Sequence, residues 1–359
     1  MESWITRKPT RRIHVGNVPI GNHAPIAVQS MTNTHTDDVT ATVAQIRQLT
    51  AAGCEIVRSA VPDPSAAAAI ATIKSRIDIP LIADVHFDHR LAITAAEAGA
   101  DGLRINPGNI GSMKKVRAVV DCARDHGIPI RIGVNSGSLE KDLVAEYGGV
   151  TPEAMVASAM RHIQLLESLY FHDIKVSLKA SDVYRTVSAY RLLSAQTDVP
   201  LHIGVTEAGG LYPGVVKSAI GIGMLLAEGI GDTLRVSLTR DPVEEVRVGY
   251  EILKALEIRR HGPEIISCPT CGRCNIDLFD IADRVEKALL TRPTPVKVAI
   301  MGCVVNGPGE AKEADVGIAG GRGQGILFKK GEIIEKLPEG DLVPRLLKEI
   351  SLMVDEEIL

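Results

Sequence analysis

The chain has 359 residues, of which 45% are hydrophobic and 23% charged, so it can bury a sizeable core and has the length of about two domains. Lysine and arginine number 40 against 44 aspartate and glutamate, and this balance disfavours nucleic acid or an anionic membrane as the main partner. The amino terminus lacks the apolar stretch of a secretory signal, and no segment is apolar for long enough to span a bilayer. We therefore expect a cytoplasmic, globular protein.

Short apolar runs typical of buried strands alternate with helical patterns over the first two thirds of the chain. The runs begin near Ala27, Glu55, Ile79, Gly102, Pro129, Ile174, Pro200 and Thr233. Helical patterns include residues 38–52, 88–98 and 243–259. Eight such repeats predict an α/β fold with a (β/α)8 TIM barrel. A doubly wound open sheet is the alternative, although no GxGxxG fingerprint follows the first strand.

The pattern changes after Arg260, where His261-Gly262-Pro263 interrupts the helical periodicity. We predict a TIM barrel in residues 1–260 and a small α+β domain in residues 261–359. In the second domain the pattern predicts a cysteine loop, a helix over 275–290, a strand over 296–301, a glycine-rich turn, a hairpin over 326–334 and a helix over 342–354. The long step between the fifth and sixth strands predicts a loop over the barrel mouth.

Charged side chains occur within the predicted parallel strands, where burial is costly unless the charge is paired. Residues two apart share a face, and the polar ones lie toward the carboxyl ends, where barrel active sites are built. They are Arg58, Asp84, His86, Arg104, Asn106, Arg131, Asn135, Lys175, Ser177, Lys179, Arg235, Ser237 and Thr239. The cations outnumber the acidic residues Asp84 and Glu207, so we expect an anionic ligand such as a diphosphate. Glu207, after the seventh strand, is a candidate general acid or base.

Several of these residues also have a structural interpretation. A lone strand arginine is commonly part of an ion pair at the barrel bottom, and Glu207 can be a loop cap. We assign His202 to the core, whereas His86 fits either a structural or a catalytic role. The run of glycines between Gly320 and Gly325 resembles a phosphate cradle, but it precedes a hairpin, and we interpret it as a turn.

Four of the six cysteines lie close together in the second domain: Cys268, Cys271, Cys274 and Cys303. In a chain without an export signal, such clustering favours metal chemistry over disulfides. A zinc ribbon normally has a second C-x-x-C pair, which is missing, whereas the C-x-x-C-x-x-C run is similar to that of bacterial ferredoxins. Iron–sulfur is therefore favoured over zinc. We interpret Cys54 and Cys122 as buried apolar thiols.

Two cysteine segments carry a resemblance to a known family. Residues 267–273 (SCPTCGR) and 302–310 (GCVVNGPGE) closely resemble the signature of the 4-hydroxy-3-methylbut-2-en-1-yl diphosphate synthase family (IspG, also called GcpE), and residues 15–21 and 27–34 match it too. The resemblance implies a [4Fe–4S] cluster held by Cys268, Cys271, Cys303 and Glu310. The family scheme needs only three cysteines, so we treat Cys274 as a near neighbour of the cluster; the alternative is that it replaces Glu310 as a ligand.

The resemblance also implies the reaction. The family reduces 2-C-methyl-D-erythritol 2,4-cyclodiphosphate to 4-hydroxy-3-methylbut-2-enyl diphosphate and water in the non-mevalonate (MEP) isoprenoid pathway, with two electrons from flavodoxin or ferredoxin. We assign catalysis to Glu207 and to the exchangeable ligand Glu310. We assign substrate binding to Arg58, Asp84, Arg104, Asn106, Arg131, Asn135, Lys179, Arg235, Ser237 and Asn306.

Two expectations about partners follow. The cluster domain begins near the barrel's bottom, away from the mouth, so we expect a head-to-tail homodimer in which one chain's cluster meets the other's barrel. For the acidic electron donor we expect a basic docking face formed by Arg273, Lys312, Arg322, Lys329 and Lys330.

Two other functions remain open at this point. One is a pterin- or phosphate-binding barrel of the dihydropteroate synthase type with a structural zinc. The other is an iron–sulfur redox sensor, which leaves the inward arginine and lysine residues unexplained.

Overall fold

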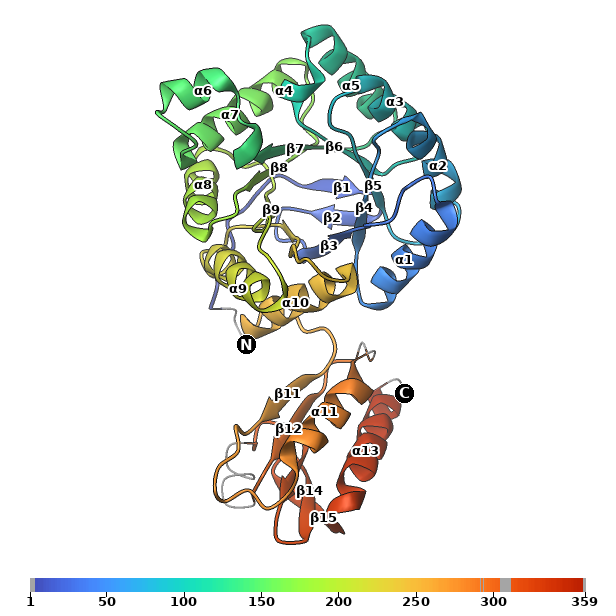
Figure 1. Cartoon of the computed structure of the whole chain (residues 1–359), viewed down its shortest axis with the longest axis vertical. Coiled ribbons are helices and arrows are strands. Elements are labelled where there is room, and N and C mark those ends of the chain that lie inside the picture. The colour runs from blue at the N-terminus through green and yellow to red at the C-terminus, as the bar shows by residue number, and fades with distance from the viewer. Residues whose placement is uncertain (1–3, 291, 293, 304–310, 358–359) are drawn as a thin grey trace. The chain divides into compact units, whose positions relative to one another are not determined.

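The chain forms two compact units, Met1–Arg259 and Arg260–Leu359, each visible in the cartoon of Figure 1. The computed structural model describes residues 4–290, 292, 294–303 and 311–357.

The first unit is a ring of eight parallel strands surrounded by helices (Figure 1). The strands are β3 (Ala27–Met31), β4 (Ile56–Ala60), β5 (Leu81–Asp84), β6 (Gly102–Ile105), β7 (Ile130–Asn135), β8 (Ile174–Lys179), β9 (His202–Ile203) and β10 (Thr233–Leu234). They pair in the order β8-β7-β6-β5-β4-β3-β10-β9, and a parallel bridge between Val176 and Leu201 closes the ring. This confirms the predicted TIM barrel and excludes the doubly wound sheet.

Helices follow the strands on the outside of the ring. They are α1 (Val39–Ala51), α2 (Pro64–Lys74), α3 (His89–Glu97), α4 (Pro107–Ile110), α5 (Met113–Asp125), α6 (Lys141–Glu146), α7 (Pro152–Ser168), α8 (Val183–Gln196), α9 (Leu211–Ala227) and α10 (Pro242–Ala255). Aspartates such as Asp38, Asp63 and Asp182 start them by accepting a backbone N–H of the first turn. The predicted loop after β7 is more ordered than expected, because it contains a 3-10 turn (Ser136–Ser138) and α6.

Alternation along the strands explains the polar interior. Val57 on β4, Leu103 on β6 and Val176 on β8 belong to the apolar core between strands and helices. Their neighbours in sequence, including Arg58 and Arg104, therefore face the inside of the ring. A barrel interior is normally filled by layers of side chains, and here the layers toward the carboxyl ends of the strands are charged.

A short hairpin closes the amino-terminal end of the barrel and is additional to the predicted elements. It consists of β1 (Ile13–Val15) and β2 (Val18–Ile20), which pair antiparallel and lie within the ring in Figure 1. Its apolar side chains pack on the first inward residues of three barrel strands; the cluster comprises Ile13, Val15, Ile20, Ala27, Ile56 and Ile82. The barrel therefore has an apolar floor.

The second unit is a five-stranded sheet with two helices. The elements are β11 (Glu264–Ser267), α11 (Leu278–Leu289), β12 (Lys297–Met301), β13 (Val316–Gly320), β14 (Gln324–Lys329), β15 (Glu332–Pro338) and α13 (Leu342–Glu357). β11, β12 and β13 are parallel, and β14 and β15 continue the sheet antiparallel. β11 and β13 are additional to the predicted elements, while the glycine-rich run forms the predicted turn, here between β13 and β14.

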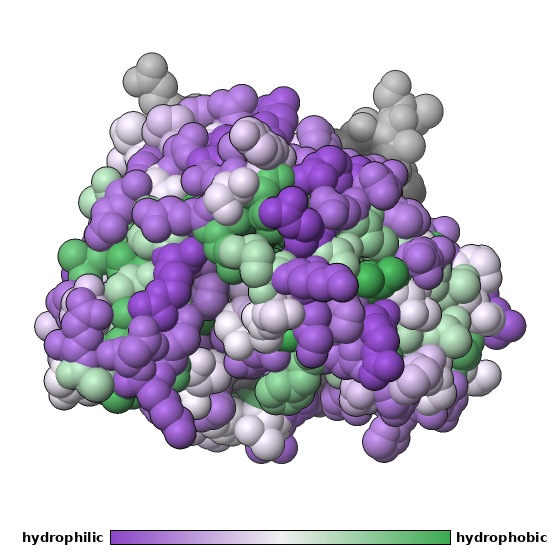
Figure 2. Space-filling view, turned by 90° about the horizontal axis from the view of Figure 1, so that it is seen from above, coloured by the Kyte–Doolittle hydropathy of each residue, from purple (hydrophilic) through white to green (hydrophobic). Residues whose placement is uncertain are grey.

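The surface in Figure 2 is mostly hydrophilic, with hydrophobic residues in small groups. Over the part of the chain that the structure describes, no helix combines the length and the apolar character needed to cross a membrane.

Candidate active site

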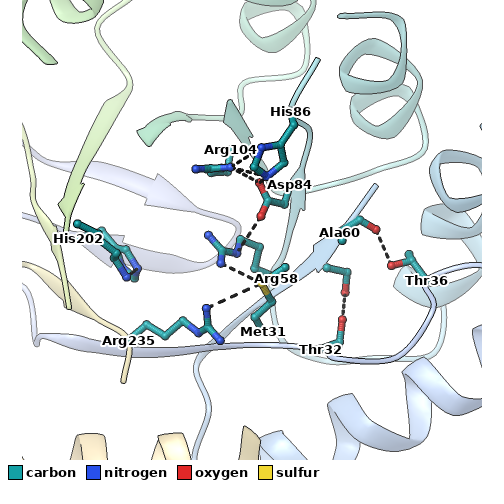
Figure 3. Close-up of polar contacts among 12 residues, drawn as sticks. Met31, Thr32, Thr36, Arg58, Ala60, Asp84, His86, Arg104, His202 and Arg235 are labelled. Atoms are coloured by element: carbon teal, nitrogen blue, oxygen red, sulfur yellow. Dashed lines mark hydrogen bonds and ion pairs between the residues drawn. The ribbon is translucent and has the colours of Figure 1, made fainter. Parts of the chain in front are cut away.

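Asp84 lies at the centre of the polar barrel interior, at the end of β5, with 5% of its surface exposed. Its carboxylate accepts a hydrogen bond from Nη1 of Arg104 at 3.0 Å and lies 3.4 Å from Nε of Arg58, as Figure 3 shows. Burial alone would raise the pKa of Asp84, but Arg58, Arg104 and Arg131 outweigh it and hold the pKa at about 2. Asp84 is therefore a permanent anion that orients two guanidinium groups.

His86 extends this group toward the mouth. Nη1 of Arg104 lies 2.7 Å from Nε2 of His86, and because a guanidinium only donates, this nitrogen is the acceptor of a neutral ring. Burial and the neighbouring guanidinium of Arg104 lower the pKa of His86, although Asp84 opposes them. His86 is a half-exposed neutral ring beside the arginines.

Arg131 and Lys179 are buried cations on β7 and β8 with 3% and 6% of their surfaces exposed. Nε and Nη1 of Arg131 have no hydrogen-bond partner among the described residues. Lys179 lies 3.4 Å from Nε2 of His202, whose Nδ1 is 2.8 Å from Oγ1 of Thr233. Burial and the nearby cations lower the pKa of both Arg131 and Lys179. An anion bound here would relieve this repulsion.

Arg235 is already paired, which the sequence did not predict. Its Nε and Nη2 donate to the two carboxylate oxygens of Glu245 at 3.2 Å each, and Glu245 on α10 is 3% exposed. Ser30 also donates to Glu245 at 3.1 Å. Glu245 is thus a further buried acid of the interior that strand patterns could not reveal, because it comes from a helix. On α10 it belongs to the buried face, with Val246, Gly249 and Leu253.

Met31 is a second unpredicted member of the site. Its sulfur accepts from Nη2 of Arg58 at 2.9 Å and lies 3.9 Å from Nη1 of Arg235, so the two guanidinium groups share one thioether (Figure 3). A thioether is a weak acceptor. These two cations therefore keep donors for an anionic ligand.

Glu207 follows β9 in a conformation that few residues other than glycine adopt. Its φ is 51°, and non-glycine residues in this region cluster at functional sites. Two backbone hydrogen bonds fix this loop. The N–H of Thr206 donates to the carbonyl of Ala180, and the N–H of Thr239 donates to the carbonyl of Gly209. The backbone thus holds Glu207 at the carboxyl end of the barrel.

The smaller polar residues lie at the same end. Asn135 pairs in register with Lys179, and Ser237 is half-buried after β10. Asn106 has a structural task, because its side-chain oxygen accepts the N–H of Gly108 at 3.0 Å and caps α4. The remaining predicted residues, Asn306 and Glu310, lie outside the described residues.

The cysteines of the second unit lie where parallel strands end. Cys268 follows β11 and accepts the N–H of Gly302 at 3.2 Å, and Cys303 follows the neighbouring β12. Hydrogen bonds from the backbone and side chain of Arg273 lower the pKa of Cys271, which favours the thiolate that binds iron. All are free thiols.

Cys274 occupies a different environment. Its thiol donates to the carbonyl of Ile276 at 3.3 Å and packs on the second unit's core. A Cβ at Gly302 would lie 2.6 Å from its sulfur. Among the described residues, no three histidine, cysteine, aspartate or glutamate side chains converge on a single metal ion. A [4Fe–4S] cluster instead takes each ligand on a separate iron, and thiols on two adjacent strand ends suit that requirement.

Comparison with known proteins decides the family. Residues 10–250 match the GcpE TIM-barrel domain, and residues 264–352 match the GcpE protein C-terminal domain. The chain belongs to the GcpE family. The motif resemblance is thereby confirmed.

Relatives of this GcpE chain include two proteins called 4-hydroxy-3-methylbut-2-en-1-yl diphosphate synthase (flavodoxin). The one from Geobacter sulfurreducens is 60% identical over 97% of this chain and 99% of its own length. The one from Thermodesulfovibrio yellowstonii is 61% identical over 96% of this chain and 99% of its own. Among solved structures, dihydropteroate synthase from Stenotrophomonas maltophilia is similar over 70% of this GcpE chain and 98% of its own, with 16% identity and a TM-score of 0.49.

Proposed function

We propose that this GcpE chain reduces 2-C-methyl-D-erythritol 2,4-cyclodiphosphate to 4-hydroxy-3-methylbut-2-enyl diphosphate, releasing water. The name of the relatives from two organisms supports this reaction. The observation that carries it is the excess of buried cations inside the barrel. The buried cations of the site are Arg58, Arg104, Arg131 and Lys179, and Arg235 is half-buried. Asp84 pairs with Arg58 and Arg104, and Glu245 pairs with Arg235.

The arginines and the lysine of the site bind the substrate in different ways. Asp84 orients Arg58 and Arg104, and Arg131 has donors without a partner among the described residues. These three guanidinium groups therefore suit bidentate hydrogen bonds to the phosphate oxygens. Lys179 supplies a point charge at the carboxyl end of β8. Glu207, on the same end, moves a proton to the hydroxyl that leaves as water. Further polar contacts to the substrate come from Asn135, Ser237 and Asn306. Asn106 adds a contact from the position where it caps α4.

The second unit holds the redox group. Cys268, Cys271 and Cys303 would bind a [4Fe–4S] cluster, with Glu310 as the exchangeable fourth ligand and Cys274 as a packing thiol. When bound, the cluster supplies electrons to the substrate one at a time. The free thiols also suit a reducing compartment, and we expect the cytoplasm.

Anaerobic purification with iron and acid-labile sulfide analysis, followed by assay with the cyclodiphosphate and reduced flavodoxin, tests this function. We expect iron, sulfide and turnover. Arg131→Met should keep the iron content and lose at least tenfold in affinity, or about 1.4 kcal/mol. Lys115→Met, an exposed change on α5, is the matched control. Zinc without sulfide, or an intact cluster without turnover, would contradict the proposal.

A head-to-tail homodimer would bring one chain's cluster to the partner's barrel. α10 is antiparallel to the strands as in any βα barrel, so the chain leaves the barrel opposite the mouth. Large apolar side chains are exposed in the loops and first helical turns around that mouth, as at protein interfaces: Phe87, Met113, Tyr147, Tyr184 and Tyr212. We propose that this rim, defined by these five residues, receives the partner's cluster domain.

Complementation between two inactive variants tests the shared site. Arg131→Met disables the barrel and Cys271→Ser disables the cluster, so neither homodimer should turn over. Coexpression should restore activity, because one mixed site combines an intact barrel with an intact cluster. Activity that stays absent in a purified mixed dimer would show that each chain uses its own cluster.

For the donor, we propose flavodoxin, which the relatives' names specify. The basic docking face expected from the sequence does not form one surface. Arg322 lies in the turn that joins β13 and β14, beside the Gly320–Gly325 pair. Lys330 lies at the opposite end of these two strands, after Lys329, which pairs with Val316. Lys329 also forms an ion pair with Glu349. Arg273 and Arg322, on the cysteine end of the sheet, are the remaining contacts. Arg322→Glu should raise the KM for flavodoxin, and Lys330→Glu should not.

A further inference from the structure

Lys175 is a buried lysine that the substrate site does not use. It lies on β8 with 1% of its surface exposed, and its Nζ has no hydrogen-bond partner among the described residues. Lys179 is four residues further along the same face, so Lys175 lies roughly 13 Å back along the strand, toward the closed end of the barrel. A buried ammonium without a partner is costly, so this position requires an explanation.

Lys175 lies beside a cation of the substrate site, on the inward face of the ring. Arg131 is its register partner on β7, and both polar atoms of the Gln29 side chain on β3 lack partners in the described structure. The hairpin residues Ile13, Val15 and Ile20 form the apolar floor against the first inward residues of β3, β4 and β5. Lys175 is thus shielded from water and has a cation of the substrate site as its neighbour.

The charged groups around Lys175 are mostly cations. Burial and the positive charges of Arg131 and Arg58 lower the pKa of Lys175, and burial and nearby cations, Lys175 among them, lower the pKa of His202. The opposing carboxylate, Asp232, is already occupied: it accepts from Thr10 at 2.9 Å, from Arg7 at 3.2 Å and from the N–H of Leu201 at 2.9 Å. Burial, Arg131 and Arg58 lower the pKa of Lys175 to about 7, and Asp232 offsets this only in part. Both protonation states are accessible near neutral pH.

We propose that Lys175 is a positioning residue that takes up a proton from solvent when the cyclic diphosphate binds above it. In the empty barrel its positive charge would add to those of Arg58 and Arg131. The dianionic ligand cancels that repulsion, and the ammonium becomes the favoured form. Ring opening then leaves a terminal diphosphate with one more ionisable oxygen, so the extra positive charge suits the product as well.

The inference rests on the proposed function, and calorimetry of the anaerobic, oxidised holoenzyme tests it without turnover. Titration with the cyclodiphosphate in buffers of different ionisation heat gives the number of protons taken up. We expect about one proton per bound molecule near pH 8, falling toward zero near pH 6, where Lys175 is already protonated. This measurement on the wild-type protein needs no variant to fold.

Variants assign the proton to Lys175. Lys175→Met should abolish the uptake near pH 8 and weaken binding about tenfold near neutral pH. Lys175→Arg, with a permanent charge, should abolish the uptake and keep the affinity. His86→Gln tests another base near the arginines whose pKa is lowered, and it should retain the uptake at this pH, as should the exposed change Lys115→Met.

Three results would overturn the inference. They are binding by the wild-type protein without uptake at any pH, uptake that persists in Lys175→Met, and heats that depend on chloride instead of buffer, which would show release of a bound anion. Failure of the cyclodiphosphate to bind at all would instead refute the proposed function, and this inference with it.

Discussion

Gly133 leaves the space that the Arg104 guanidinium occupies. A Cβ at residue 133 would lie 2.4 Å from Nε of Arg104 and 2.8 Å from its Nη2, closer than van der Waals contact allows. The two residues are on neighbouring strands of the barrel, β7 and β6, and both face inward. A missing side chain on one strand therefore fixes the position of a cation on the next.

Gly133→Ala should displace Arg104 and raise the Kd for the cyclodiphosphate at least tenfold, or about 1.4 kcal/mol. Gly133 does not have a positive φ, so the added methyl group acts through the guanidinium and not through backbone strain. Calorimetric titration of the oxidised enzyme measures the effect. Gly223→Ala on α9, where nothing lies within 4 Å of the added Cβ, is the control; equal affinities in both variants would refute the role of Gly133.

Asp84→Asn should destabilise the barrel near pH 7 by about 2 kcal/mol, the equivalent of the lowered pKa. The folded-state pKa of Asp84, about 2, is below its ordinary value of 3.8. Its contribution to stability is therefore complete above about pH 5 and is lost as the pH falls toward 2. The difference in unfolding free energy between wild type and variant should shrink over that interval.

Thermal and urea unfolding followed by circular dichroism check this pH dependence. Asp125→Asn, at an exposed position at the end of α5, controls for the removal of a negative charge. A difference that stays constant from pH 7 to 2 would show that Asp84 does not act through its ionised form.

Glu207→Gln should keep the visible and EPR spectra of the cluster and lose turnover by at least a hundredfold, the usual range for removing a general acid. The side chain is nearly isosteric, so the left-handed backbone is retained. Stopped-flow reduction and steady-state assay separate binding from catalysis. Turnover close to that of Glu146→Gln, an exposed control on α6, would remove Glu207 from the catalytic role.

Cys274→Ser should leave the anaerobic iron and sulfide content unchanged, because its sulfur packs on Ile276 and Gly302 instead of facing open space. The exchange costs about 1 kcal/mol of stability from the loss of packing. Cys271→Ser is the contrasting variant and should lose the cluster. Loss of iron from both would make Cys274 a ligand.

The barrel could be predicted because each strand repeats the same pattern. Arg58, Arg104 and Arg131 alternate with apolar residues such as Val57, Leu103 and Ile132, and this period both marks a strand and assigns the charges to the inside. The strand positions and the inward cations were therefore readable residue by residue. The family signature added the cysteine segments.

Contacts between elements could not be read in this way. Glu245 reaches Arg235 from a helix, and Met31 joins two arginines through a sulfur that hydropathy counts as apolar. The hairpin strands β1 and β2 have three residues each, too short for a periodic signal. Lys175 and Lys179 occupy the same inward face of β8, so the sequence pattern treats them alike. Only the position of the apolar floor shows that Lys175 lies deeper in the barrel.

The closed floor gives the barrel a single entrance. Substrate and product must then use the same opening between the carboxyl ends of the strands, and one cannot enter before the other has left. The hydroxylated diphosphate product should accordingly be a competitive inhibitor against the cyclodiphosphate. Release of this more highly charged product from the same arginines then becomes a natural candidate for the step that limits the rate.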